Sequence, residues 1–390
     1  MCYEGRPMKN TWIELDAAAL ARNIQRLREV LAPATTVIFV VKSNAYGHGL
    51  IPVARCAWAC GIRWFAVAHV DEALPLRALL PEANILLLSP IAPAEVAAAL
   101  AADLTPVLTD EQQALALAAA ARARGQTLSC HAKIDTGMGR LGFFWEEALE
   151  ALPRLAREPG LQLRGLCTHF SAAGGEADGF TDEQARRFQR VAQACAAAGI
   201  SGLLRHASNS SALLCDSAWD LDGVRPGILL YGYAPPVQVR AAPAAGRAPP
   251  TPRRVRVEPC LAWRTRIVQV KKVPAGFPVS YDRTYLTPRE THLAVLDVGY
   301  ADGYSRQLSN RAEVVIGGRR RPVVGRVTMN LTVVDLGPAG DAAPGDTATL
   351  LGRDGAAAVW ADEMAAWRGT IPYEVLTNIR TDDIRVQGET

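Results

Sequence analysis

Residues 37–42 read VIFVVK, a run of β-branched and aromatic side chains that closes on a lysine, and seven comparable runs follow it. They are WFAVA (64–68), NILLLS (84–89), LTPVLT (104–109), LSCHAKID (128–135), LQLRGLCTHF (161–170), LLRHASN (203–209) and DGVRPGILLYG (222–232). Longer stretches rich in Ala, Leu, Glu and Arg separate these runs, as is typical of helices. Eight strands alternating with helices predict an α/β fold, the (β/α)8 TIM barrel, whose active sites lie at the carboxyl ends of the strands.

One of the helical stretches carries its own start signal. Thr181 followed by Gln184 has the spacing of a capping box, and Phe188, Val191 and Cys195 then recur at helical intervals. We therefore expect a helix that begins at Thr181 and buries this apolar side.

The pattern changes after the eighth run. Residues 240–254, RAAPAAGRAPPTPRR, lack apolar periodicity, and we interpret them as a linker or surface loop. Short β-type runs separated by turn residues follow, which predicts a mostly antiparallel β domain with one helix near 361–367.

The two regions define the expected domains. The barrel is predicted at 17–244 and the β domain at 255–390. The segment TWIELD at 11–16 alternates like a strand, and we expect it to join the β domain from the other end of the chain.

Composition excludes several classes of protein. A net charge of +3 over 390 residues gives no sign of a nucleic-acid or membrane partner, and no apolar run reaches the length of a membrane span. The first ten residues, MCYEGRPMKN, lack the apolar core of a secretory signal, so the expected location is the cytoplasm. The eight cysteines do not have zinc-ligand spacing, and no metal site is predicted.

Lys42 is the first candidate for chemistry. A lysine that closes a buried strand is costly to keep charged, and burial lowers its pKa toward the neutral amine that a Schiff-base enzyme needs. The alternative is a lysine that caps the strand and extends into solvent. Position alone leaves both interpretations open.

Other strand ends also carry polar residues. His169, Asn209, Ser210 and Arg225 each follow or end a predicted strand, although a lone histidine there is more often structural. Several polar groups at one face of a barrel favour a site. Ser210 and the backbone N–H groups of Gly227 and Ile228 have the position of a barrel phosphate site.

Longer motifs then point to a family. They are FVVKSNAYGHG (39–49), KIDTGMGRLG (133–142), THF (168–170), RPGILLYG (225–232), VSYDRTY (279–285), VGYADGYSR (298–306), VGRVTMN (324–330) and PYEVLTNI (372–379). In this order, and over nearly the whole chain, the sequence resembles the alanine racemases, fold-type III enzymes that use pyridoxal phosphate. The resemblance implies racemisation of a small amino acid, which would supply D-alanine for peptidoglycan or allow D-alanine to be used.

The resemblance also implies roles for individual residues. Lys42 would bind pyridoxal phosphate covalently, and Arg225 would face its pyridine nitrogen. His169 would link Arg225 to Tyr281, a second base that comes from the partner subunit of a homodimer. The remaining implied contacts are Tyr46, Tyr373, Asn209, Ser210, Gly227 and Ile228 with the cofactor, Arg140 with cofactor and substrate, the Met329 backbone N–H with the substrate carboxylate, and Lys133 as a carbamylated lysine beside Arg140.

The chemistry of racemisation supports two of these roles independently. A proton must leave one face of the α-carbon and return to the other, which two bases on opposite faces achieve directly. Lys42 can be one base, and a tyrosine can be the other if cationic neighbours favour its phenolate. A guanidinium is a poor acid, so Arg225 would leave the pyridine nitrogen unprotonated and limit leakage into transamination.

One motif departs from the family. VGRVTMN carries Asn330 where alanine racemases usually have Asp, and Thr328 where Cys or Ser is usual. Loss of an acid on the substrate side leaves open a racemase of serine or of a broader set of amino acids, while neutral drift is the plainer explanation.

Two other functions are weighed against racemisation. A non-catalytic pyridoxal-phosphate carrier would lack the second domain and Tyr281. A decarboxylase would have to release the carboxylate that Arg140 is expected to hold.

Overall fold

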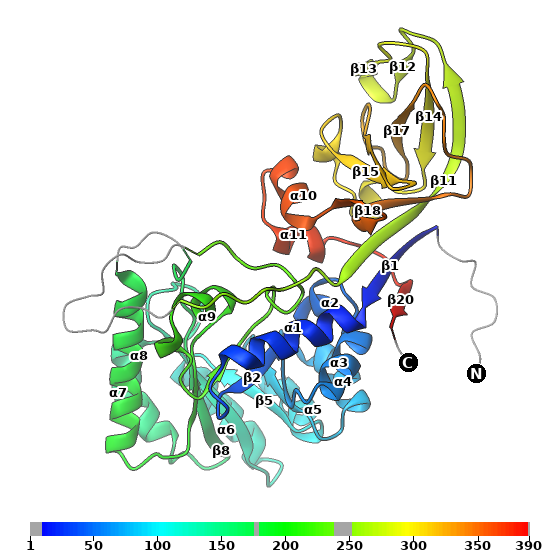
Figure 1. Ribbon diagram of the computed structural model, residues 1–390. Coiled ribbons are helices and arrows are strands. Elements are labelled where there is room, and N and C mark those ends of the chain that lie inside the picture. The colour runs from blue at the N-terminus through cyan, green and yellow to red at the C-terminus, as the bar shows by residue number, and fades with distance from the viewer. Residues whose placement is uncertain (1–9, 175–178, 238–251, 389–390) are drawn as a thin grey trace. The chain divides into compact units, whose positions relative to one another are not determined.

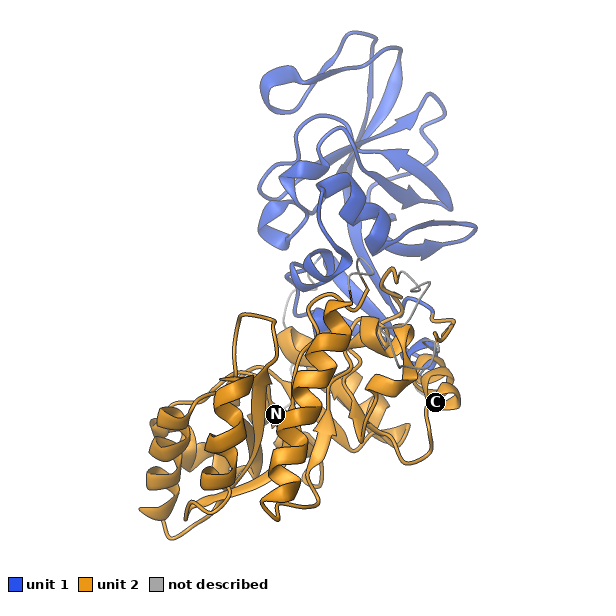
Figure 2. Cartoon of the chain, turned by 90° about the vertical axis from the view of Figure 1, so that its left-hand side faces the viewer, with its two compact units in different colours: residues 1–20, 46–49, 258–390 blue, residues 21–45, 50–257 orange. Residues whose placement is uncertain are grey.

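The computed structural model describes residues 10–174, 179–237 and 252–388 (Figure 1). Most of the predicted linker at 240–254 and the first nine residues lie outside these ranges. The chain divides into two compact units, one of residues 21–45 and 50–257 and the other of residues 1–20, 46–49 and 258–390 (Figure 2). None of the helices in the described ranges is long and apolar enough for a membrane span.

The first unit contains the predicted barrel. Its parallel strands pair in the order β5-β4-β3-β2-β10-β9-β8-β6, and a further pairing of β5 with β6 closes the ring. The TIM-barrel prediction is confirmed, because all eight predicted runs form these strands. They are β2 (Thr36–Val40), β3 (Trp64–Val67), β4 (Asn84–Leu87), β5 (Leu104–Leu108), β6 (Leu128–Asp135), β8 (Leu161–Cys167), β9 (Leu204–His206) and β10 (Gly223–Val224).

Helices follow the barrel strands. Besides α1 (Ala17–Val30), which precedes β2, they are α3 (Leu50–Ala59), α4 (Val70–Leu79), α5 (Val96–Ala101), α6 (Glu111–Arg122), α7 (Trp145–Leu155), α8 (Phe180–Ala197) and α9 (Ser210–Cys215). Helix α6 shows how the sequence defines one of them. The Asp110 carboxylate accepts from the Gln113 N–H at 2.7 Å, and the Gln113 side chain accepts from the Thr109 N–H at 2.8 Å. Four small or apolar residues, Ala114, Leu117, Ala118 and Ala121, then form its buried side.

The predicted capping box at Thr181 is wrong. Helix α8 begins at Phe180 after Gly179, so Thr181 lies inside the first turn, where it is buried. The Gln184 side chain instead accepts from the Ser171 N–H at 3.0 Å and donates to the His169 carbonyl at 3.2 Å. The Gln184 side chain, which a capping box would have used, therefore binds the loop after β8 instead.

The second unit is built on a mostly antiparallel sheet. Its main order is β16-β15-β18-β11-β1-β20, with β14 pairing to β11 and β17 and with β19 pairing to β18. The strands are β1 (Thr11–Asp16), β11 (Leu261–Val273), β14 (Thr291–Leu296), β15 (Glu313–Ile316), β16 (Arg319–Pro322), β17 (Thr332–Gly337), β18 (Thr347–Asp354), β19 (Ala357–Val359) and β20 (Ile384–Gln387). Strand β1 pairs antiparallel with β11 and parallel with β20. The predicted helix near 361–367 is α10 (Ala361–Arg368), and α11 (Pro372–Thr377) follows it.

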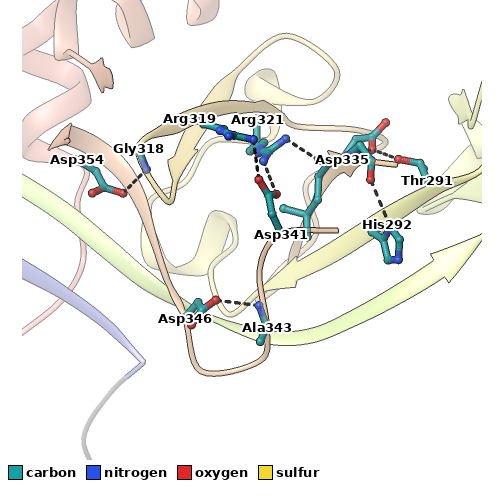
Figure 3. A network of polar contacts seen from close by, with 12 residues as sticks. Thr291, His292, Gly318, Arg319, Arg321, Asp335, Asp341, Ala343, Asp346 and Asp354 are labelled. Atoms are coloured by element: carbon teal, nitrogen blue, oxygen red, sulfur yellow. Dashed lines mark hydrogen bonds and ion pairs between the residues drawn. The ribbon is translucent and has the colours of Figure 1, made fainter. Parts of the chain in front are cut away.

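A short hairpin, β12 (Pro278–Val279) and β13 (Tyr285–Leu286), is attached to this sheet through Asp335. The buried Asp335 carboxylate on β17 accepts from the Thr291 hydroxyl (Figure 3). It also accepts from the Gly337 N–H, and from the Tyr285 hydroxyl at 3.4 Å. Next to it, Arg321 donates to the Leu336 carbonyl and pairs with Asp341. These contacts join β13, β14, β16 and β17, and they hold the hairpin that carries Tyr281.

Close backbone packing at Gly303 gives a testable prediction for this unit. Gly303 has a φ of +97°, and a Cβ there would lie 1.9 Å from the Asn378 carbonyl oxygen, whereas Gly276 has a φ of +77° with nothing within 4 Å. Both Gly→Ala changes incur a left-handed penalty of about 1–2 kcal/mol, but only Gly303→Ala must also displace backbone. We expect Gly303→Ala to lower the urea midpoint clearly more than Gly276→Ala. Equal midpoints for the two variants would contradict the close approach at Gly303.

Candidate active site

Nine of the predicted site residues lie at one end of the barrel. Lys42 follows β2, Lys133 lies on β6 with Arg140 in the loop after it, and His169 follows β8. Asn209 and Ser210 follow β9, and Arg225, Gly227 and Ile228 follow β10. Because the strands are parallel and closed, these carboxyl ends share one mouth of the barrel. Tyr46, Tyr281, Met329 and Tyr373 belong to the other unit.

Arg225 is the most buried charge at this mouth, with 5% of its surface exposed. Its guanidinium donates to the His206 ring Nδ1 at 2.6 Å and to the His206 carbonyl at 2.7 Å. It also donates to the carbonyls of Thr168 at 2.5 Å and Ala207 at 2.9 Å. No hydrogen bond links Arg225 to His169 among the described residues, although the charge of Arg225 acts on His169. The His169 Nε2 instead lies 3.3 Å from the Asn209 amide nitrogen.

Sequence reasoning missed the two histidines that complete this arrangement. The guanidinium has only donors, so His206 Nδ1 must accept, and its proton lies on Nε2. That nitrogen lies 2.9 Å from Nδ1 of His131, which must accept in turn. His131 lies two residues before Lys133 on β6, on the same side of the strand, and this spacing is the signal that could have revealed it.

Both histidines are neutral. Burial lowers the pKa of His131 to about 3, with the charge of Arg225 adding to the effect. Burial and then Arg225 hold the pKa of His206 well below its usual value. Gly165 lies against the His131 ring, because a Cβ there would lie 2.7 Å from its Nε2. The pair therefore forms a fixed, uncharged chain of hydrogen bonds that starts at Arg225.

The mouth carries an excess of positive charge. Burial lowers the pKa of Lys42, Arg140 lowers it further, and Glu72 opposes them. Burial also lowers the pKa of Lys133. His169 lies among these cations, and burial together with the charges of Arg225, Lys133, Arg140 and Lys42 lowers its pKa to about 2.

Arg140 is held by the loop that follows β6. The Asp135 carboxylate accepts from the backbone N–H groups of Gly137, Met138, Gly139 and Arg140 at 2.8–3.1 Å. Partial burial alone would raise the pKa of Asp135, but these backbone hydrogen bonds outweigh it and lower the pKa. The loop is therefore fixed at its backbone, while Arg140 itself is exposed.

Backbone donors gather near Ser210. Its buried hydroxyl oxygen accepts from the Gly227 N–H at 3.1 Å and from the Leu229 N–H at 3.4 Å. The N–H of the buried Ile228, between them, has no acceptor among the described residues. A buried donor without an acceptor is costly, and a phosphate oxygen would satisfy it.

Four of the predicted site residues, Tyr46, Tyr281, Met329 and Tyr373, belong to the second unit. Tyr46 and Tyr373 have ring centroids 6.0 Å apart. Burial raises the pKa of Tyr373 to about 12 and raises that of Tyr46 as well, so both phenols are neutral donors. Tyr281 and Met329 are 69% and 56% exposed.

The charged and hydrogen-bonding groups at the mouth of the barrel suit a particular kind of ligand. Four cationic residues, among them a lysine shifted toward its neutral form, and an unpaired backbone donor suit an anion that also carries a carbonyl group, as pyridoxal phosphate does. In the described ranges, no group of three His, Cys, Asp or Glu side chains could hold a metal ion. The fold and the site together define a class, the TIM-barrel enzymes with a lysine-centred anion site.

Comparison with known proteins narrows this class. Family models match the chain over residues 15–235 (alanine racemase, N-terminal domain) and 260–387 (alanine racemase, C-terminal domain). The chain is 40% identical to alanine racemase from Carboxydothermus hydrogenoformans over 95% of its own length and 98% of the relative's. The chain therefore belongs to the alanine racemase family.

Two solved structures have the same fold. Alanine racemase from Bacillus anthracis with bound L-Ala-P is 33% identical and superposes with a TM-score of 0.86, over 96% of this chain and 94% of that one. Alanine racemase from Bartonella henselae with covalently bound pyridoxal phosphate is 26% identical, with a TM-score of 0.81 over 97% and 99% of the two chains.

The neutral histidines predict how stability depends on pH. His131 binds its proton at a pKa of about 3 when folded but near 6.5 when unfolded, so the unfolded chain binds more protons between these values. Stability is therefore full above about pH 6.5 and falls as the pH drops, by up to ~1.4 kcal/mol per pH unit for each such imidazole. Urea unfolding between pH 7.5 and 4.5 measures how the free energy of unfolding changes with pH. This change should be smaller in His131→Gln by about the contribution of one proton, because the variant lacks one such imidazole. The loss of stability at pH 7.5 serves as the control for packing, and an unchanged slope would contradict a neutral His131.

Proposed function

We propose that the protein interconverts L-alanine and D-alanine with pyridoxal phosphate bound at Lys42. The observation that carries this proposal is the mouth of the barrel, where His169 lies among the charges of Arg225, Lys133, Arg140 and Lys42, and where burial lowers the pKa of Lys42. When bound, the cofactor withdraws electrons from the substrate and acidifies its α-proton. The chain's own residues then have to bind, orient and exchange protons.

Binding of the cofactor would use both kinds of donor in the structure. We expect Ser210 and the N–H groups of Gly227 and Ile228 to hold the phosphate, together with the neutral phenols of Tyr46 and Tyr373. Asn209, His169 and Arg140 complete the proposed cofactor contacts. Arg140, fixed at its backbone by Asp135, would also bind the substrate carboxylate.

Arg225 would face the pyridine nitrogen as a donor that keeps its proton. Burial lowers the pKa of Arg225, yet a guanidinium begins from so high a value that it stays charged in proteins. The acceptors around it, two carbonyls and one ring nitrogen of neighbouring strands among them, favour this charged state. The pyridine nitrogen would therefore remain unprotonated.

Two bases would exchange the α-proton. We propose that the Lys42 Nζ, shifted toward the neutral amine, takes or returns the proton on one face, and that the Tyr281 oxygen acts on the other. Each base accepts in one direction of the reaction and donates in the other, so the same two groups serve both enantiomers.

Exposed apolar residues support a second copy of the chain as the source of Tyr281. Tyr300, Met329 and Leu331 are 42%, 56% and 40% exposed, and Tyr281 is 69% exposed. The loops of Tyr300 and Met329 are joined by hydrogen bonds from the Tyr300 N–H to the Thr328 carbonyl at 3.0 Å and from the Ala301 N–H to the Met329 carbonyl at 2.9 Å. A homodimer that covers this surface would bring Tyr281 and the Met329 N–H to the partner's barrel.

Several finer points belong to the same proposal. Lys133, whose pKa is lowered by burial, is the proposed carbamylated lysine, because carbon dioxide reacts with a neutral amine. The domains are proposed at 17–244 and 255–390, the location in the cytoplasm, and the use of D-alanine in peptidoglycan or as a nutrient. Because the exposed Asn330 stands where the family usually has Asp, a racemase of serine or of a broader set of amino acids is the second candidate.

The activity itself is tested by chiral chromatography of the purified protein with each L-amino acid in turn. We expect L-alanine to reach an equal mixture of enantiomers ahead of all others, and Lys42→Ala to remove the activity. Faster conversion of serine would move the specificity to the loop of Thr328 and Asn330. No racemisation of any amino acid would contradict the proposed function.

The origin of Tyr281 is tested by mixing two inactive variants, Lys42→Ala and Tyr281→Ala. If each site takes Tyr281 from the partner, a mixed dimer contains one intact site, so random exchange of subunits restores about a quarter of the wild-type sites. Each variant alone, carried through the same exchange step, is the control. A mixture that stays inactive although mixed dimers form would show that Tyr281 acts within its own chain.

A further inference from the structure

A left-handed turn follows Lys42. Ser43, Asn44, Ala45 and Tyr46 have φ angles of 53–55°, and Gly47 has a φ of 79°. Each non-glycine residue in this conformation costs about 1–2 kcal/mol, so four in succession persist only if their surroundings hold them. The sequence SNAY contains no glycine that would have relieved the strain.

One carboxylate holds the start of this turn. Glu72, in the first turn of α4, accepts from the Ser43 N–H at 2.5 Å through one oxygen. Its other oxygen accepts from the Ala68 N–H at 2.7 Å. Ser43 follows β2 and Ala68 follows β3, so a single side chain joins two neighbouring loops at the mouth of the barrel.

The rest of the turn has contacts of other kinds. The Tyr46 ring lies beside that of Tyr373, with centroids 6.0 Å apart. The Ala45 N–H donates to the Val41 carbonyl at 2.9 Å, and the Asn44 side chain accepts from the Leu50 N–H at 2.8 Å. Both contacts lie within the segment 41–50 and move with it. Glu72 is the contact that ties Ser43 to a different loop.

Glu72 also contributes charge. Among the groups that act on Lys42, Arg140 disfavours its ammonium form and Glu72 favours it, while His169 nearby is neutral. A helix-starting glutamate often accepts only from the backbone just before its own helix, as Glu72 does from Ala68. Glu72 also accepts from the Ser43 N–H, which capping of its own helix does not require.

We propose that Glu72 is a positioning residue that holds the left-handed turn after Lys42 in place and so sets the orientation and charge of the lysine that binds the cofactor. This inference rests on the proposed function, since it concerns the same lysine. It assigns the role to the carboxylate itself, because two oxygens are needed for two N–H donors and the negative charge is needed near Lys42.

Two variants separate these requirements. Glu72→Gln keeps the length but replaces one acceptor oxygen with an NH2 donor and removes the charge, whereas Glu72→Asp keeps the charge but shortens the reach. Glu82→Gln is the matched control, because Glu82 is exposed and has no side-chain contact among the described residues.

The first measurement is hydrogen exchange of the cofactor-free protein, followed by mass spectrometry of peptides that cover Ser43 and Ala68. We expect both Glu72 variants to lose protection in these peptides and Glu82→Gln to match the wild type. This measurement does not depend on the proposed function. Wild-type protection in both Glu72 variants would overturn the proposal.

The second measurement is the absorbance change when cofactor-free protein binds pyridoxal phosphate, followed across pH. Both Glu72 variants should bind more weakly, by about tenfold, the factor expected for loss of one charge-assisted hydrogen bond. Only Glu72→Gln should shift the pH midpoint of the reaction at Lys42 downward, because only it removes the charge that favours the ammonium. Lost protection with unchanged binding and midpoint would overturn the role toward Lys42, while a wild type that fails to bind would refute the proposed function instead.

Discussion

A guanidinium inside a barrel has to find acceptors for its N–H groups, and the burial of Arg225 imposes this requirement on every strand around it. Carbonyls at the ends of β8 and β9 supply three acceptors, and the ring of His206 supplies a fourth. A charged imidazole could not accept, so the cation selects the neutral form of His206 and, through it, the tautomer of His131. The neutral state of both histidines follows from this one placement.

The same end of the barrel combines several features that are unfavourable on their own. Like charges lie close together, two lysines are partly desolvated, and four residues in succession adopt a left-handed backbone. Carboxylates and amides of the chain offset part of this cost, with Asp135 holding four N–H groups and Glu72 holding two loops. An anionic ligand would relieve the remaining repulsion and stabilise the folded chain.

The local pattern of apolar and polar residues was enough to predict much of the fold. Each barrel strand is a short apolar run between helical stretches, and the alternation of the later runs predicted the antiparallel sheet. Contacts between distant residues were less accessible. Gln184 was assigned to its own helix, but its side chain binds the loop after β8. The spacing of His131 before Lys133 places it on the same side of β6, but the sequence near His131, His206 or Glu72 does not indicate which distant residue each side chain contacts. The left-handed turn at Ser43–Tyr46 could not be predicted either, because its residue types do not favour it and distant groups hold it.

The place of β1 in its sheet has a consequence for the order of assembly. Thr11 on β1 pairs with Thr265 on β11, 254 residues later, and the other edge of β1 pairs with β20 near the end of the chain. All eight barrel strands are synthesised before β11, whereas β1 has both edges unpaired until β11 is made and one edge unpaired until β20 is made. Strand β1 therefore needs protection during synthesis that the barrel strands do not need.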